Sequence, residues 1–308
     1  MQKPELLCTA ANLDEIHHLI NAGVDAINIG HEQFGLRVSG NFSREETEKA
    51  IQICHEHHVK VYISTNALFH NGQLEELESY LRFLAALHAD AIIFGEPTVL
   101  MLARKVAPNL PLHWNPEMLC TNVETINYWG TKGATRAYLA RELNMDSILE
   151  IKEDAEIEIQ VQVFGPTCIF QSRRDLVASY QNYLGENNDS PGKEKRLYLK
   201  EEKRQEVCYP VYEDRNGTNI LSAEDLCILE HLDELIDGGI DSFQIEGILR
   251  TTEELVKIVT VFRKAIDSYC LDPQTYRTQI AGWMEQLRAI QPAKRPLTTG
   301  FYFKEQVF

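Results

Sequence analysis

The chain has 308 residues, of which 44% are hydrophobic and 25% charged, as in a soluble globular protein of one or two domains. It contains no run of 18 or more apolar residues and begins without the apolar stretch of a signal peptide, so we expect neither a membrane span nor export. Its seven scattered cysteines favour a reducing cytoplasm over a disulfide framework. Proteins that grip DNA or RNA usually have a basic surface, and with a formal net charge of −16 any such surface must be local or supplied by a partner.

Short β-type runs alternate with helical runs along the chain. The first strand is expected at 4–10 and the first helix at 12–23, where Leu13, Ile16 and Leu19 recur at helical spacing and Gly23 ends the helix. The alternation continues with strands at 25–30, 60–66, 89–95, 111–119, 135–143, 156–165 and 240–247, and helices at 44–58, 72–88, 96–107, 123–133, 144–154, 222–239 and 251–269.

Eight strand–helix units predict an α/β fold of the (β/α)8 TIM-barrel type. The competing open, doubly wound sheet is disfavoured because no G-x-G-x-x-G follows the first strand. We expect the barrel to occupy 1–270, with a looser polar insert around 166–220 whose stretch 185–196 is exposed. Residues 271–308 should add a helix at 273–290 and a tail that packs on the barrel.

A barrel places its active site at the carboxyl ends of its strands. The chemistry-bearing residues expected there include Thr9, His31, Asn66, Asn115, Glu117, Arg141, Glu142, Cys168 and Glu246. We select Arg141, Glu142, Glu246, Asn66 and Asn115 as candidate catalytic residues. Arg141 can pair with a substrate carboxylate in bidentate fashion, and the two asparagines can orient a bound molecule by hydrogen bonds.

Familiar catalytic motifs are absent from the sequence. There is no G-x-S-x-G and no P-loop, and the histidines of 54–58 lack the H-E-x-x-H spacing of a zinc protease. Cys168, Cys208 and Cys227 belong to one strand–loop–helix unit, with Cys227 expected in the first turns of the helix at 222–239. Thiolates favour zinc or iron–sulfur clusters, but the spacing alone leaves metal ligand, nucleophile and buried thiol all open.

The sequence resembles the collagenase-like family known as peptidase family U32 over almost its whole length. The matching segments are "PELLCTAANLDEIHHLINAGVDAINIG", "FGLRVSGNFS", "KVYISTN", "NPEMLCTNVETINYWGTKGATRAYLAREL", "LSAEDLCILEHLDELIDGGIDSFQIEG" and "TTGFYF". The short chain is similar to the smaller member of a Gram-positive protein pair that hydroxylates the wobble uridine of tRNA. The fold implied is again a barrel.

The resemblance implies oxygen-independent hydroxylation of wobble uridine to 5-hydroxyuridine, with prephenate as hydroxyl donor. Arg141, Glu142 and Glu246 would then contact the donor. The partners implied are tRNA and a longer homologous chain in a heterodimer. Two alternatives stay open: a peptidase in which Cys168 pairs with a rim histidine such as His31, and a non-catalytic subunit that stabilises a catalytic homologue.

The resemblance also implies a cofactor, because hydroxylase members hold a [4Fe-4S] cluster through cysteines of the 163–175 region and two later positions. Cys168, Cys208 and Cys227 match three of these ligands. Asp175 stands where the family has its second cysteine, and Arg173 stands where it has a glycine. The expected cluster therefore has an incomplete cysteine set, with Asp175 in the fourth place.

Overall fold

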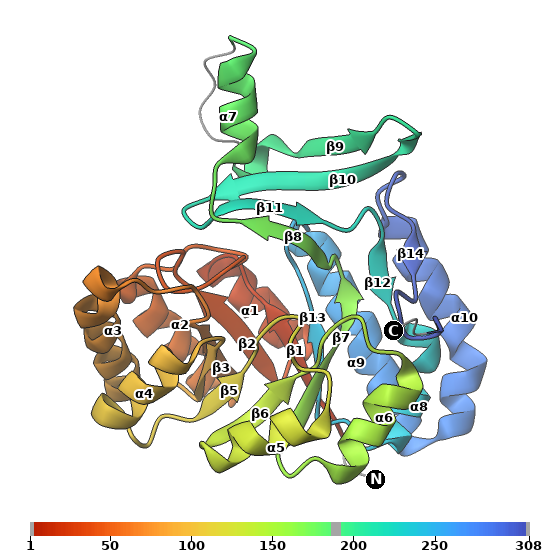
Figure 1. The fold of residues 1–308 in the computed structure, drawn as a ribbon. Coiled ribbons are helices and arrows are strands. Elements are labelled where there is room, and N and C mark those ends of the chain that lie inside the picture. Colours follow the sequence, from red (N-terminus) through yellow and green to blue (C-terminus); the bar gives the residue numbers. More distant parts are fainter. Residues whose placement is uncertain (1–2, 186–191, 306–308) are drawn as a thin grey trace.

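The computed structural model of the protein describes residues 3–185 and 192–305. Within them, eight parallel strands form a closed barrel (Figure 1), because β13 pairs with both β1 and β7. The barrel strands are β1 Glu5–Thr9, β2 Ala26–Gly30, β3 Lys60–Ser64, β4 Ala91–Phe94, β5 Leu112–Trp114, β6 Ala134–Tyr138, β7 Glu158–Gly165 and β13 Ser242–Ile245. The predicted (β/α)8 fold is confirmed.

Helices surround the barrel and follow its strands in turn. They are α1 Leu13–Ala22, α2 Arg44–Glu56, α3 Leu74–Ala86, α4 Pro97–Val106, α5 Val123–Thr131, α6 Met145–Asp154, α8 Leu232–Asp237 and α9 Thr252–Leu271. Local signals set their ends: the Asn12 side chain accepts a hydrogen bond from the Glu15 amide at the start of α1, and Gly23 ends that helix with a φ of 99°. No helix in the described part of the chain is long and apolar enough to cross a membrane.

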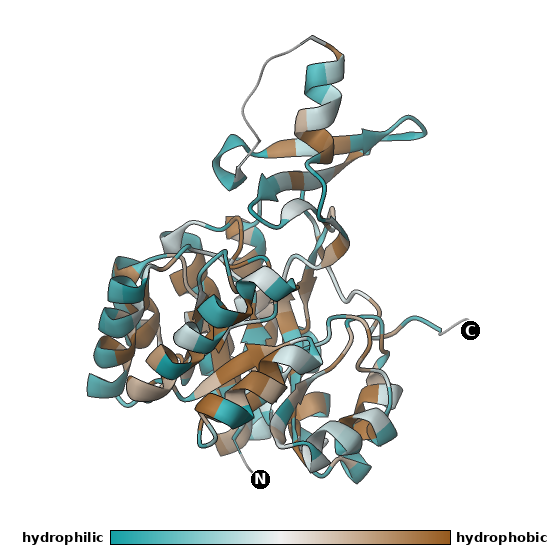
Figure 2. Ribbon diagram, turned by 60° about the vertical axis from the view of Figure 1, so that its left-hand side comes forward, coloured by the Kyte–Doolittle hydropathy of each residue, from teal (hydrophilic) through white to brown (hydrophobic). Residues whose placement is uncertain are grey.

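The main core lies between the strands and the helices. On β1, Leu6 and Cys8 point outward into this core, whereas Leu7 belongs to a separate cluster inside the barrel. Apolar residues accordingly follow the strands and the inner sides of the helices, while the outer helix faces are hydrophilic (Figure 2). Each large side chain buried here contributes about 1.5–3 kcal/mol to stability.

The insert after β7 is a folded unit that stands above the carboxyl ends of the barrel strands (Figure 1). It is an antiparallel sheet of β8 Cys168–Ser172, β11 Gly217–Leu221, β10 Arg204–Asp214 and β9 Leu197–Glu201 in that order, with helix α7 Leu176–Tyr183. The sequence suggested only a looser, polar insert, and its segments Leu197–Glu201 and Arg204–Asp214 pair as antiparallel strands. Half of the stretch expected to be exposed, 186–191, lies outside the described residues.

The helix predicted at 222–239 was wrong in its first half. Residues Asp225–Cys227 form strand β12, which pairs antiparallel with β7, and α8 begins only at Leu232. The tail strand β14, Leu297–Thr298, pairs with β12 and follows helix α10, Pro273–Ile290, which packs against α9. Pairing on both sides of β12 overrides the helical spacing of its side chains.

Candidate functional site

The barrel mouth is polar because strand alternation turns polar side chains inward at the carboxyl ends. Together with the loop that follows β2, these side chains enclose a cavity of about 40 Å³. Its polar lining consists of Thr9, Asn28, Arg37, Ser39, Ser64, Asn66, Asn115, Glu117, Arg141, Gln244 and Glu246. Most barrel interiors are filled at this level by branched apolar residues, so this cavity is a candidate site.

Glu117 is the centre of an ion-pair network at the mouth. Its carboxylate pairs with the guanidinium groups of Arg37 and Arg141, the latter at 3.1 Å. Asn66 Nδ2 lies 3.5 Å from the same carboxylate, and Arg141 Nε donates to Gln162 Oε1 at 2.7 Å. Burial alone would raise the pKa of Glu117, but the two arginines outweigh it and hold that pKa below its usual value.

The backbone around this network is strained. Arg37 and Glu117 adopt left-handed conformations, with φ of 50° and 64°. A non-glycine residue pays about 1–3 kcal/mol for such a conformation, which persists where the surrounding structure enforces it. The left-handed conformation of Glu117 is stabilised by a hydrogen bond from its backbone amide to Asn115 Oδ1 at 3.1 Å. Asn115 therefore positions the carboxylate through the backbone.

Glu246 is a second carboxylate on the same cavity, in a different environment. Its Oε1 accepts hydrogen bonds from the Thr9 hydroxyl at 3.0 Å and the Ile248 amide at 3.1 Å, and Ser39 Oγ lies 3.4 Å away. Burial raises the pKa of Glu246 above its ordinary value. Glu117 is thus held ionised while Glu246 takes up a proton more readily, a separation typical of acid–base sites.

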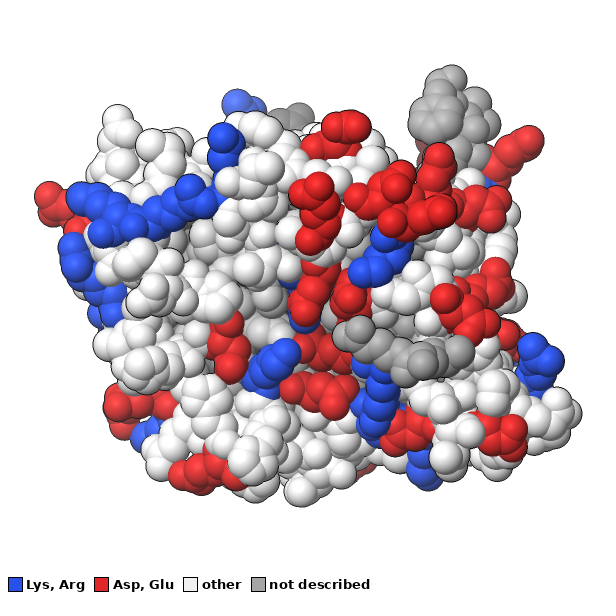
Figure 3. Space-filling view, turned by 90° about the horizontal axis from the view of Figure 1, so that it is seen from below, with Lys and Arg blue, Asp and Glu red and all other residues white. Residues whose placement is uncertain are grey.

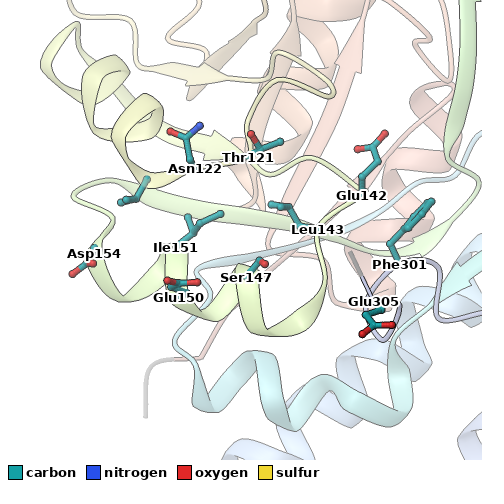
Figure 4. Close-up of a pocket in the computed structure, with 11 residues that line it drawn as sticks. Thr121, Asn122, Glu142, Leu143, Ser147, Glu150, Ile151, Asp154, Phe301 and Glu305 are labelled. Atoms are coloured by element: carbon teal, nitrogen blue, oxygen red, sulfur yellow. The ribbon is translucent and has the colours of Figure 1, made fainter. Parts of the chain in front are cut away.

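Four of the five candidate catalytic residues line this cavity: Asn66, Asn115, Arg141 and Glu246. Glu142 does not. It is exposed and lies in an outer cavity of about 580 Å³ between α5, α6 and the tail, with Glu150, Asp154 and Phe301 (Figure 4). Arg37 was missed because its loop has no periodic pattern, although it falls within the quoted "FGLRVSGNFS" segment.

The proposed cluster ligands are not brought together. Cys168 lies on β8 and Cys208 on β10, and β11 lies between these strands, which are therefore about 10 Å apart. Cys227 lies on β12 with its Sγ 4.0 Å from Met284 Sδ, and Asp175 is exposed before α7. Within 3–185 and 192–305, no group of three or more His, Cys, Asp or Glu side chains is arranged to hold a metal ion.

The chemistry of these thiols agrees with their placement. Cys227 is buried, and burial raises its pKa to about 12. The Cys168 thiol donates to the Phe170 carbonyl at 3.4 Å. As folded here, the four residues do not fit a [4Fe-4S] cluster, and we derive no step through one.

The opposite end of the barrel holds a separate polar network. Glu5 accepts from Arg136 Nη1 at 2.5 Å, from the Tyr62 hydroxyl at 2.7 Å and from the Ser242 hydroxyl at 3.0 Å. Arg136 also pairs with Glu158 at 2.7 Å. Acidic and basic side chains are intermixed on this face (Figure 3). The network closes the base of the barrel.

The fold and the mouth together define a TIM-barrel protein with a candidate active site at the carboxyl ends of its strands. Residues 11–307 match the sequence profile of peptidase family U32. The chain is 48% identical to tRNA hydroxylation protein P2 of Bacillus subtilis over the full length of both proteins. The chain belongs to peptidase family U32, as the resemblance predicted.

Other relatives show how varied the names within this family are. All of the chain aligns with 74% of tRNA hydroxylation protein P1 of Bacillus subtilis at 31% identity. A protein named collagenase, from Porphyromonas gingivalis, is 23% identical over 98% of the chain and 74% of its own length. The solved structure of a U32 peptidase shares the fold with a TM-score of 0.50 and 16% identity, covering 79% of the chain and 92% of that structure.

Proposed function

We propose that this protein takes part in tRNA hydroxylation. The observation that carries the proposal is the end-to-end identity of 48% with tRNA hydroxylation protein P2. The barrel mouth supports it, because it offers two arginines and two carboxylates with opposite pKa shifts. Carboxylates whose pKa values are shifted apart in this way are typical of acid–base sites.

The reaction we propose is the oxygen-independent conversion of wobble uridine to 5-hydroxyuridine with prephenate as hydroxyl donor. A carboxylate of the donor would compete with Glu117 for Arg37 and Arg141, whose guanidinium groups already bind one carboxylate there. Glu246 would hold or release a proton beside the bound molecule. Asn66 and Asn115 would keep Glu117 and its arginines in place.

The partner we propose is a longer homologue of the same family in a heterodimer. Its support is that the longer protein P1 aligns with the whole of this chain and occurs in the same organism as protein P2. The excess of acidic residues, 46 against 30 basic ones, also favours a partner that supplies much of the tRNA-binding surface. Co-purification of the two chains from cells of this protein's own species tests the pairing.

The deciding experiment is nucleoside mass spectrometry of bulk tRNA from a strain that lacks the gene and any redundant family member. Loss of 5-hydroxyuridine and its derivatives, restored by the wild-type gene, is the expected result. Unchanged 5-hydroxyuridine would overturn the proposal. Restoration by wild type but not by Arg141→Lys would separate a catalytic subunit from a purely stabilising one, with exposed Arg277→Lys on α10 as the matched control.

Peptide hydrolysis gains no support from the site. The Cys168 thiol donates to the Phe170 carbonyl, and the His31 ring packs against Phe34 with ring centroids 5.8 Å apart. The comparison with collagenase is also the more distant one, at 23% identity. Gelatin cleavage that disappears in Cys168→Ala would revive this alternative.

A further inference from the structure

A second cavity lies where the insert meets the barrel and the tail. Its volume is about 70 Å³, and none of its lining residues lines the cavity at the barrel mouth. Four segments distant in sequence contribute to it: the insert, strand β12, the loop after β13 and the tail. The residues that line it include Lys193, Arg196, Tyr212, Asp225, Arg250 and Arg295.

The charge of this lining is strongly positive. Four basic residues, Lys193, Arg196, Arg250 and Arg295, face one acidic residue, Asp225. Asp225 is fully buried and pairs with both Arg250 and Arg295 at 2.5 Å. The lining therefore carries four positive charges against one negative charge, a net charge of +3, although the whole chain is acidic.

Two buried hydrogen-bond donors among the lining residues have no partner. They are Arg250 Nη1, on a side chain that is 3% exposed, and the hydroxyl of Tyr212, a residue that is 1% exposed. The Arg250 guanidinium lies over the face of the Phe164 ring. This contact does not involve the Nη1 protons, which lie in the guanidinium plane and have no hydrogen-bond acceptor. Buried donors without partners are rare and costly, and each calls for an explanation.

Lys193 adds a cation from the insert. Its ammonium lies 5.4 Å from the centre of the Tyr212 ring and donates to the Val38 carbonyl. Burial lowers the pKa of Lys193, and this effect outweighs the opposing influence of the carboxylates of Glu32, Asp214, Glu246 and Glu194. A negative ligand nearby would reverse that effect.

We propose that this cavity binds an oxyanion, a phosphate or carboxylate group carried by a small molecule. Arg250, Tyr212, Lys193 and Arg196 would surround the anion with donors, and guanidinium groups suit the geometry of both oxyanions. Leu197, Pro210, Ile248 and Pro292 give the cavity apolar walls for a short organic portion. A ligand held there would tie the insert to the barrel and the tail.

The test is isothermal titration calorimetry of the full chain with inorganic phosphate and, separately, with malonate, at an ionic strength fixed by chloride. Saturable binding with one site per chain is expected for at least one of the two probes. Phosphate alone would identify a phosphate-bearing ligand, and malonate alone a carboxylate-bearing one. Absence of saturable binding for both would overturn the proposal.

Two double variants locate the site. Lys193→Gln with Arg196→Gln removes two lining cations and should weaken binding at least tenfold. Lys200→Gln with Lys203→Gln makes the same charge change on exposed residues of the insert that do not line the cavity, and should leave binding within about twofold. Equal losses in both would show a general charge effect and overturn the proposal. Circular dichroism checks that both variants fold, and Arg250 is left intact because it pairs with buried Asp225.

Discussion

The two ends of the barrel contain similar side chains in different states. At the base, Glu5 binds Arg136 and two hydroxyl groups, and Arg136 binds Glu5 and Glu158, all on ordinary strand backbone. At the mouth, Arg37 and Glu117 sit on strained backbone, and Glu246 has a raised pKa. The same residue types therefore stabilise one end and leave the other prepared for a ligand. The predictions below test this contrast, from the largest expected effect to the smallest.

Arg136→Met should destabilise the protein by about 3–5 kcal/mol, because it leaves the Glu5 carboxylate buried without its cation. Chemical denaturation measures the free energy of unfolding. Arg141→Met at the mouth is the matched variant and should cost about 1 kcal/mol or less, because Arg141 is 24% exposed and water can reach its partner. Equal losses would remove the distinction between the ends.

Glu246→Gln should lower tRNA hydroxylation by about a hundredfold or more, because the amide cannot exchange a proton. Nucleoside mass spectrometry of the complemented deletion strain measures this loss. Glu253→Gln at the exposed start of α9 is the control and should retain full activity. If Glu246→Gln supports hydroxylation at the wild-type level, Glu246 has no role in the reaction.

The two mouth carboxylates should give opposite pH dependences of stability. Glu117 has a lowered pKa, so its contribution is present above its ordinary value of 4.5 and is lost as the pH falls through the folded-state pKa. Glu246 has a raised pKa, so its contribution is present below 4.5 and is lost as the pH rises through the folded-state value.

Unfolding free energies of Glu117→Gln and Glu246→Gln, measured from acid to neutral pH, check this pair. Relative to wild type, Glu117→Gln should become more destabilised as the pH rises. Glu246→Gln should instead gain relative stability over the same range. Parallel curves would show that the two carboxylates share one environment.

Lys60→Met should change the free energy of unfolding by less than about 0.5 kcal/mol, although Lys60 also pairs with Glu5. Its side chain is 56% exposed and its ammonium lies 3.4 Å from the carboxylate, so water screens the pair. Chemical denaturation at low and high salt measures the effect. A loss near that of Arg136→Met would mean that Glu5 depends on both cations equally.

The barrel could be predicted because each strand and helix carries its own periodic pattern. Four candidate residues could be placed for the same reason, since a strand end fixes where its last side chains point. Glu142 was misplaced because β6 ends at Tyr138, and in the loop beyond it Arg141 turns into the mouth whereas Glu142 lies at the outer cavity. Segment 225–227 reads as a helix, and only its pairing with β7 and β14 makes it a strand. Such distant pairing leaves no local signal.

The hydrogen bond between Thr9 and Glu246 joins residues 237 positions apart. The barrel closes only when β1 pairs with β13, which is the last barrel strand in the sequence. Ribosomes add residues in order, so the first strand leaves the ribosome long before its neighbour is made. Tyr302, whose hydroxyl donates to the carbonyl of Gln162 beneath Arg141, arrives later still. The candidate site is therefore completed only after the last barrel strand and the tail have been synthesised.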